Sequence, residues 1–182
     1  MNNENLFFYS TVCHVCKRSR DVDLKRCMGC KMISYCCVDH QKINWPAHKS
    51  LCRCIQFITK QQMIKSLYAN GRTVESRLEW ARLRSNAMIM TETWIKRRLL
   101  LFEQQMFMFP RVCEVCLVQD EKSMQDCDSC HSASYCSTNH QEEHLPVHRK
   151  HCEQLRKCFL IDLFFYQDES YPSINFKFEK SY

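Results

Sequence analysis

The chain has 182 residues, a formal net charge of +6 and fifteen cysteines, but only two glycines, Gly29 and Gly71. Loops that cradle phosphate groups need several glycines for close backbone approach, so this composition argues against nucleotide-dependent chemistry. No stretch approaches the roughly 18 consecutive apolar residues of a membrane helix, which predicts a protein that does not span a membrane.

The N-terminal lead, residues 1–12, is polar apart from an apolar cluster at residues 6–9. It has neither the basic n-region nor the long apolar h-region of a secretory signal, so we expect an intracellular protein, nuclear or cytoplasmic. We interpret the apolar cluster as a cap that packs on the first repeat or on the helices that follow it. Cysteines in a reducing compartment are more often metal ligands than disulfides.

Residues 13–52 contain eight Cys and His residues whose spacing recurs, gap for gap, one hundred positions later. Eight such ligands in forty residues can close two tetrahedral zinc sites, and a unit of this size buries too little apolar surface to fold without a metal or disulfides. We therefore predict four Zn2+ ions, two per repeat. The predicted ligands are Cys13, Cys16, Cys27, Cys30, Cys36, His40, His48 and Cys52, then Cys113, Cys116, Cys127, Cys130, Cys136, His140, His148 and Cys152.

Twelve of these ligands are cysteines, which bind zinc as thiolates. Counting twelve thiolates and four Zn2+ ions brings the net charge to about +2, so the basic composition is a poor argument for nucleic acid. A disulfide framework is the alternative, and the Cys-x2-Cys pairs followed by His-x3-Cys disfavour it.

Within the first repeat, Gly29 is expected to allow a tight turn in the second cysteine pair. Cys36 and His40 are four residues apart, as are His48 and Cys52, so helical turns would place each pair on one face. Pro46 is expected to end or kink the first of these turns. The eight ligands can be divided sequentially or in a cross-braced manner, and both divisions carry the same charge, so the residues leave this choice open.

The segment Tyr35-Cys36-x3-His40-Gln41-x3-Trp45-x2-His48-Lys49-x2-Cys52 resembles the MYND-type zinc finger. The second repeat keeps Tyr135, Gln141 and Pro146 but has Leu145 in place of Trp45. The resemblance implies a cross-braced fold, in which Cys13, Cys16, Cys36 and His40 hold one ion, Cys27, Cys30, His48 and Cys52 hold the other, and the second repeat does the same. The family usually has Cys at His40 and His140; imidazole is an ordinary zinc ligand, so we retain both histidines.

The linker, residues 53–112, is expected to be helical rather than flexible. One helix is predicted over 55–69, with a stop at Asn70-Gly71, and a second over 74–109, where apolar residues recur in steps of four and three. Ser85 and Glu92 interrupt this heptad-like seam. We expect the two helices to form a hairpin, whose uncovered end, 94–109, packs on the second repeat, on the C-terminal tail, on another copy of the chain or on a different protein.

The predicted organisation is thus two small zinc-stabilised modules, 13–52 and 113–152, joined by long helices and followed by a C-terminal segment, 153–182, with a short helix and a strand around residues 174–178. Three cysteines fall outside the repeat, and we interpret them as small apolar residues. His144 lies within reach of a metal on the helix, but Asn44 takes its place in the first repeat, so we expect a surface histidine. The three cysteines are Cys37, Cys54 and Cys158.

The resemblance implies a protein-interaction module whose relatives bind short proline-rich peptides of the P-x-L-x-P kind. Gln41 and Trp45 match residues of that groove; the alternative is that Trp45 packs inward. We expect a non-enzymatic adaptor that binds its partner mainly through the first finger. Eight ligands per finger leave no open metal position, and no SET-domain cofactor motif or RING-type central spacing occurs here. The HIT-type zinc finger is the nearest rival family, and Gln41 and Trp45 favour MYND.

Two other functions remain as alternatives. The linker carries eleven Lys and Arg against four Glu, with a consecutive triplet at residues 96–98, which would suit a nucleic-acid-binding regulator. MYND fingers also occur within SET-domain methyltransferases, so the chain could be the non-catalytic part of a larger methyltransferase-like protein. A solvated helix face is the usual fate of such basic residues, and we therefore favour the adaptor.

Overall fold

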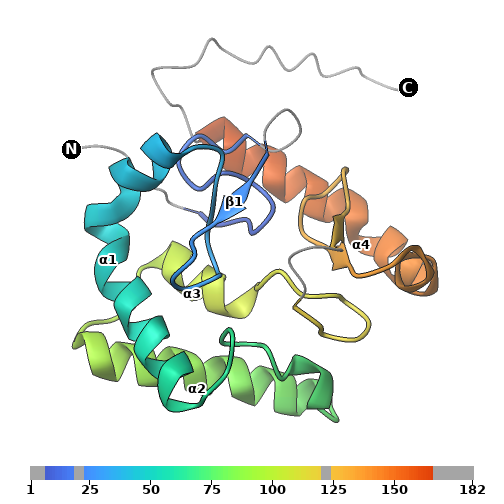
Figure 1. Cartoon of the computed structure of the whole chain (residues 1–182). Coiled ribbons are helices and arrows are strands. Elements are labelled where there is room, and N and C mark those ends of the chain that lie inside the picture. The colour runs from blue at the N-terminus through green and yellow to red at the C-terminus, as the bar shows by residue number, and fades with distance from the viewer. Residues whose placement is uncertain (1–6, 19–22, 120–123, 166–182) are drawn as a thin grey trace.

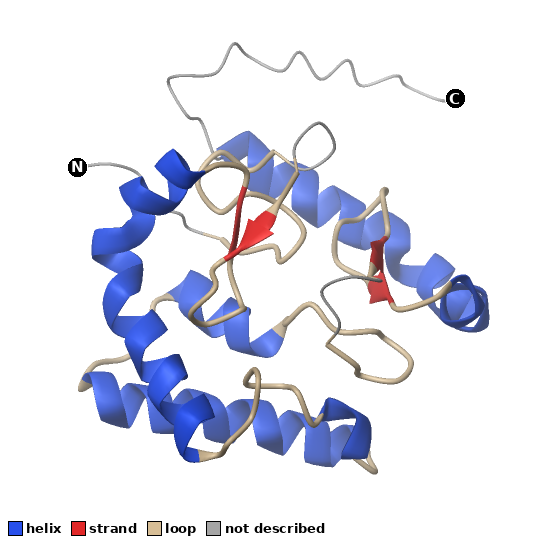
Figure 2. Cartoon of the chain, in the orientation of Figure 1, coloured by secondary structure: helices blue, strands red, loops and turns tan. Residues whose placement is uncertain are grey.

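A computed structural model of the chain describes residues 7–18, 23–119 and 124–165. Figures 1 and 2 show α1 and α4 on opposite sides of the molecule, α3 at its centre and α2 along one edge. The predicted architecture, two small modules joined by helices, is confirmed. The elements are β1 (Lys25–Arg26), β2 (Ser34–Tyr35), α1 (Val38–Gln61), the 3-10 helix η1 (Gly71–Thr73), α2 (Arg77–Ile95), α3 (Leu101–Met108), β3 (Gln125–Asp126), β4 (Ser134–Tyr135) and α4 (Thr138–Phe165).

Each repeat folds as a two-stranded antiparallel hairpin followed by a long helix. β1 pairs with β2, and β3 pairs with β4 in the same register. The residue after each Cys-x2-Cys pair has a left-handed backbone, and its N–H donates to the carbonyl of the first cysteine, as from Lys17 to Cys13 at 2.8 Å. This closes each pair into a tight loop that brings its two sulfurs together. The left-handed residues are Lys17, Lys31, Leu117 and His131, with φ between 55° and 61°.

Gly29 has a different role from the one predicted, since neither glycine of the chain has a positive φ. A Cβ atom built on Gly29 would lie 2.8 Å from the Cys52 Sγ atom, closer than such contacts allow. Glycine is therefore needed here for space. It lets the helix that carries Cys52 come against the second cysteine pair.

The helix of the first repeat, α1, does not end at Pro46, and α4 likewise continues through Pro146. Proline removes one N–H donor from the helix, but the buried side chains Asn44 and His48 on either side hold α1 against its hairpin. α1 then extends to Gln61, so the helix predicted at 55–69 is its last part, and the chain turns before residue 69.

The single helix predicted over 74–109 is wrong, because the chain forms two helices, α2 and α3, with a break at residues 96–100. Ser76 caps α2, and its Oγ accepts a hydrogen bond from the Glu79 N–H at 3.1 Å. Lys96 ends the helix in a left-handed conformation, with φ of 56°. The uninterrupted seam on which self-association was predicted is therefore absent.

Two glutamates stabilise this break. Glu92 accepts hydrogen bonds from the backbone N–H of Leu99 and from the Arg98 guanidinium, both at 2.9 Å. Glu103 is 1% exposed and accepts a bidentate pair from Arg97, at 2.6 and 2.7 Å. Glu103 also accepts from the Leu100 N–H at 2.8 Å, which caps α3. Two of the three consecutive basic residues are thus used within the fold, which weakens the nucleic-acid alternative.

The main hydrophobic core lies between the first finger and the linker helices. Ile55 and Ile58 of α1 meet Trp80 and Ala87 of α2, while Phe107 of α3 is fully buried beside them. Met88 and Ile95 of the predicted seam pack against this core, but Leu78 of the same seam is 61% exposed, so the buried face of α2 only partly matches the expected one. The core cluster also includes Cys13, Cys16, Cys27, Cys30 and Cys52, but none of the equivalent cysteines of the second finger.

Residues 7–11 form a strap that ties the first finger to the second. The Tyr9 ring packs edge-on against Phe159 of α4 at 4.9 Å, and its hydroxyl donates to Asp162 at 2.9 Å. The Thr11 hydroxyl donates to the His131 carbonyl at 2.7 Å. The strap therefore links the N-terminal side of the first finger to the second finger and to the end of α4.

The C-terminal helix predicted after Cys152 is the second half of α4, which begins inside the second finger. The strand predicted around residues 174–178 lies outside the described residues. Within the described part of the chain, no helix has the length and apolar character needed to cross a membrane.

Candidate metal centres

The structure brings the sixteen predicted ligands together in four groups of four, and in each group the candidate ligand atoms lie within 4.8 Å of one another. The grouping alternates along the chain, which is the cross-braced arrangement that the resemblance implied. The outer groups are Cys13, Cys16, Cys36, His40 and Cys113, Cys116, Cys136, His140; the inner groups are Cys27, Cys30, His48, Cys52 and Cys127, Cys130, His148, Cys152.

The outer groups are nearly identical in the two fingers. His40 presents its Nδ1 atom 3.0 Å from the Cys36 Sγ and 3.5 Å from the Cys13 Sγ, and the distances from His140 to Cys136 and Cys113 are the same. The sulfur–sulfur distance from Cys16 to Cys36 is 3.6 Å. A tetrahedral zinc ion with bonds of about 2.3 Å to sulfur has sulfur–sulfur edges of about 3.8 Å, so these residues fit Zn2+.

The inner groups fit the same ion, but use the other imidazole nitrogen. The Cys27 and Cys52 sulfurs are 3.6 Å apart, and the His48 Nε2 atom lies 3.4 Å from the Cys30 sulfur. In the second finger the corresponding distances are both 3.7 Å. All four inner ligands of the first finger are buried, whereas Cys127 and Cys152 are only half-buried.

The first cysteine of each pair is predisposed to ionise. A hydrogen bond from the Cys16 thiol lowers the pKa of Cys13 to about 4, although burial opposes the shift. Burial also opposes ionisation of Cys113, but the backbone N–H groups of Cys116 and Cys136 outweigh it and lower the pKa of Cys113 to about 7. A tight loop of N–H donors therefore favours the thiolate that a metal requires.

The other Cys and His residues singled out in the sequence lie outside the four groups. His144 faces Tyr135, with its Nδ1 atom 3.1 Å from the tyrosine hydroxyl, where Asn44 accepts from Tyr35 in the first finger at 2.7 Å. Cys54 is buried in the core, while Cys37 and Cys158 are exposed. The Cys37 sulfur lies 3.9 Å from that of Cys36.

Gln41 and Trp45, the predicted peptide-binding residues, lie one helical turn apart on α1. The Trp45 side chain is 37% exposed, and its ring meets His48 edge-on at 6.2 Å. The Trp45 ring is therefore not packed inward, which was the alternative. Leu145, at the equivalent position of the second finger, is 39% exposed.

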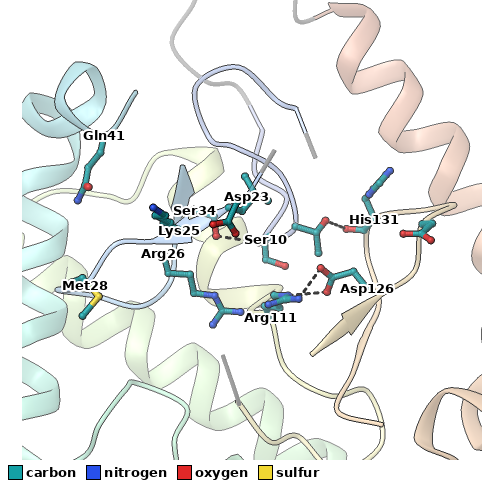
Figure 3. A pocket seen from close by; sticks show the side chains of 13 residues that line it. Ser10, Asp23, Lys25, Arg26, Met28, Ser34, Gln41, Arg111, Asp126 and His131 are labelled. Atoms are coloured by element: carbon teal, nitrogen blue, oxygen red, sulfur yellow. Dashed lines mark hydrogen bonds and ion pairs between the residues drawn. The ribbon is translucent and has the colours of Figure 1, made fainter. Parts of the chain in front are cut away.

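A cleft of about 670 Å3 lies between the two fingers, and the sequence analysis did not anticipate it. Figure 3 shows Gln41 and Met28 at one end, Lys25 and Arg26 in the middle and Asp126 and His131 at the other end. Arg111 crosses its floor and forms two hydrogen bonds to the Asp126 carboxylate, at 2.7 and 2.8 Å. These residues are far apart in sequence, so only their proximity in the fold reveals the cleft.

Comparison with known proteins agrees with this geometry. The family model for the MYND finger matches residues 13–52 and 113–152. A Rho GTPase-activating protein, gacZ, of Dictyostelium discoideum is 54% identical over 41 residues, which is 22% of this chain but 4% of that protein. No solved structure matches the chain.

Proposed function

Because the chain carries two MYND fingers, which are zinc-binding, non-catalytic protein-interaction modules, we propose that it is an adaptor. It binds a short proline-rich segment of a partner protein, mainly through the first finger. The observation that supports this most directly is the partly exposed Trp45 ring, one turn after Gln41 on a helix whose position is set by both metal groups of that finger.

The sixteen clustered Cys and His residues would hold four Zn2+ ions, each by four protein atoms. When bound, zinc supplies folding free energy here, because closed four-ligand sites leave no position for a substrate or water. The helix that presents Gln41 and Trp45 contributes His40 to the outer group and both His48 and Cys52 to the inner group. The peptide-binding surface of the first finger is thus expected to depend on both ions.

An exposed indole beside an amide suits a proline-rich ligand. The flat proline ring packs on an aromatic face, and the Gln41 amide can bond the peptide backbone. Proline-rich segments are already extended, so they lose little conformational entropy on binding. The second finger keeps Gln141 but has Leu145, which offers apolar area without an aromatic face. We therefore assign the second finger a weaker affinity for the same ligand.

A residue exchange between the fingers tests this assignment. The probe is a fluorescent peptide with a P-x-L-x-P core, and the measurement is its dissociation constant by anisotropy. Trp45→Leu should weaken binding about tenfold or more, because truncating a tryptophan at the centre of an interface commonly costs about 2 kcal/mol or more. Leucine is chosen because Leu145 already occupies this position beside a ligand histidine in the second finger.

The matched control is Leu145→Ala, which should change the dissociation constant less than twofold. Elemental analysis should return four zinc ions per chain for the wild type and for both variants. If the peptide binds Trp45→Leu as tightly as wild type, or if Leu145→Ala alone abolishes binding, the proposed assignment to the first finger is wrong.

A further inference from the structure

The cleft between the fingers begins where the proposed peptide site ends. Gln41 belongs to both, and Met28, which is 77% exposed, lies beside it at the same end of the cleft. From there the cleft runs past Lys25 and Arg26 to the second finger (Figure 3). A volume of about 670 Å3 is within the range of pockets that enclose most of a small ligand, so it can accommodate a short extended chain segment.

The wall that the first finger contributes is formed largely by its two-stranded sheet. Among the described residues, this sheet consists of β1 and β2. The outer side of β2 is held against the first cysteine pair, because the Ser34 carbonyl accepts the His14 N–H at 2.9 Å. Lys25 and Arg26 of β1 and Ser34 of β2 line the cleft.

The two walls carry opposite net charge. On the first finger, Asp23, Lys25 and Arg26 sum to +1. On the opposite wall, Asp126 and Asp128 of the second finger, together with Arg111 at the end of the linker, sum to −1. The fingers are copies of one another, yet Arg26 corresponds to Asp126 and Met28 to Asp128. The opposite charges of the two walls therefore come from residues that differ between the two fingers.

We infer that the cleft is the second half of the peptide site, and that the bound segment carries an acidic side chain next to its proline-rich core and a basic side chain farther from it. The acidic residue lies beside Lys25 and Arg26, and the basic residue lies beside Asp126 and Asp128. This inference rests on the proposed function, since it places the core on Gln41 and Trp45. In this arrangement the second finger contributes to ligand specificity, although it lacks the tryptophan of the first finger.

The strap and the end of the linker hold the two walls of this composite site at a fixed spacing. The strap holds them through the Thr11 bond to the His131 carbonyl, and both residues line the cleft. The Arg111 bonds to Asp126 join the end of the linker to β3. A ligand that spans the cleft therefore meets walls whose spacing is already set, which limits the conformational entropy lost on binding.

The experiment compares peptides that share the P-x-L-x-P core. One set has a Glu-then-Lys extension, counted outward from the core, at the N- or C-terminal end; the sign-swapped set has Lys then Glu. With wild-type protein at low salt, one Glu-then-Lys peptide should bind about fivefold tighter than the core alone, and its sign-swapped counterpart should not. The gain should shrink as salt is added, because the contacts are solvent-accessible.

Charge reversal on the protein should invert this preference. The double variant Lys25→Glu with Asp128→Lys should favour the sign-swapped peptide, and Asp128→Asn should lose about half of the gain in free energy. Lys65→Glu, an exposed charge outside the cleft, should behave as wild type. Zinc content should be four ions in each variant, which separates a lost contact from a lost fold.

The outcomes separate the two proposals. If the core peptide binds and depends on Trp45, but the extensions and charge variants change nothing, the inference about the cleft is overturned and the proposed function stands. If the core peptide does not bind the wild-type protein, both are overturned.

Discussion

The two fingers share one ligand pattern but differ in what surrounds it. The first finger merges with the main core, and all four of its inner ligands are buried. The second finger contributes no ligand cysteine to that core, and half of its inner ligands remain partly exposed. A shared ligand pattern therefore does not imply equal stability, because the core that packs the linker helices includes ligand cysteines of the first finger and none of the second.

The largest expected effect comes from removing one inner ligand in each finger. Cys52→Ser should lower the melting temperature and the helical circular dichroism signal more than Cys152→Ser. Cys52 lies in the core with Ile55 and Leu51 on the same helix, so losing its metal site loosens α1 and the packing of α2 upon it. Loss of a structural zinc site removes several kcal/mol of folding free energy.

The control for this pair is metal analysis, which should show fewer than four zinc ions in both variants. Equal melting temperatures for the two would contradict the difference in support between the fingers.

The next largest effect concerns Gly29 and its counterpart in the second finger, Ser129. Gly29→Ala places a Cβ 2.8 Å from the Cys52 sulfur, so it should cost about 1–3 kcal/mol of folding free energy and weaken the inner zinc site of the first finger. Ser129→Ala, at the exposed equivalent position, should have almost no effect. Competition with a chelator measures the zinc affinity of both variants. If they retain zinc equally well, the space around Gly29 does not limit zinc binding.

Acidification should release zinc from the outer site of the second finger. A thiol whose pKa is lowered in the folded state favours the ionised, metal-binding form above that pKa, and this advantage is lost as the pH falls through it. The pKa of Cys113 is about 7 without the metal, so protons begin to compete for this ligand as the pH falls through 7, and bound Zn2+ moves the release to lower pH.

Finger-specific release can be followed with a zinc indicator while the pH is lowered. His40→Cys and His140→Cys, which restore the usual family ligand one finger at a time, should each move only one release step. A zinc release step of the second finger that does not move in His140→Cys would contradict the prediction.

The smallest effect concerns the residues that begin α1 and α4. Ser137 accepts a hydrogen bond from the His140 N–H at 3.3 Å, whereas Cys37 caps α1 without any side-chain hydrogen bond. Cys37→Ser should therefore stabilise the protein by about 0.5–1 kcal/mol, and Ser137→Cys should destabilise it by a similar amount. Chemical denaturation of the zinc-loaded protein measures both, and a lower stability for Cys37→Ser would contradict the capping argument.

The sequence was sufficient for features that depend on local spacing. Ligand pairs three or four residues apart are brought together by one loop or one helical turn, and the repeat made the pattern clear. The pairing of distant ligands came only from resemblance, since charge and spacing allow two divisions. Glu92 was visible as an exception in the apolar seam, but its bonds to Leu99 and Arg98 across a break depend on the backbone turning there.

The features that could not be predicted are those that join distant parts of the chain. Gly29 faces Cys52 because α1 folds back on the hairpin, and no local rule gives that distance. The cleft requires β1 and β3, about one hundred residues apart, to face one another. Pro46 does not end the helix, because the contacts of the buried residues Asn44 and His48 on either side hold α1 together across it.

The strap has a consequence for dividing the protein into fragments. A fragment that begins at Cys13 contains every ligand of the first finger, yet it lacks Tyr9 and Thr11 and leaves the aromatic face of Phe159 without its cover. A fragment that holds the second finger and all of α4, but not residues 7–11, has the same uncovered face. Fragments that contain Phe159 without the strap should therefore be prone to aggregation, and replacing Phe159 by a polar residue should relieve it.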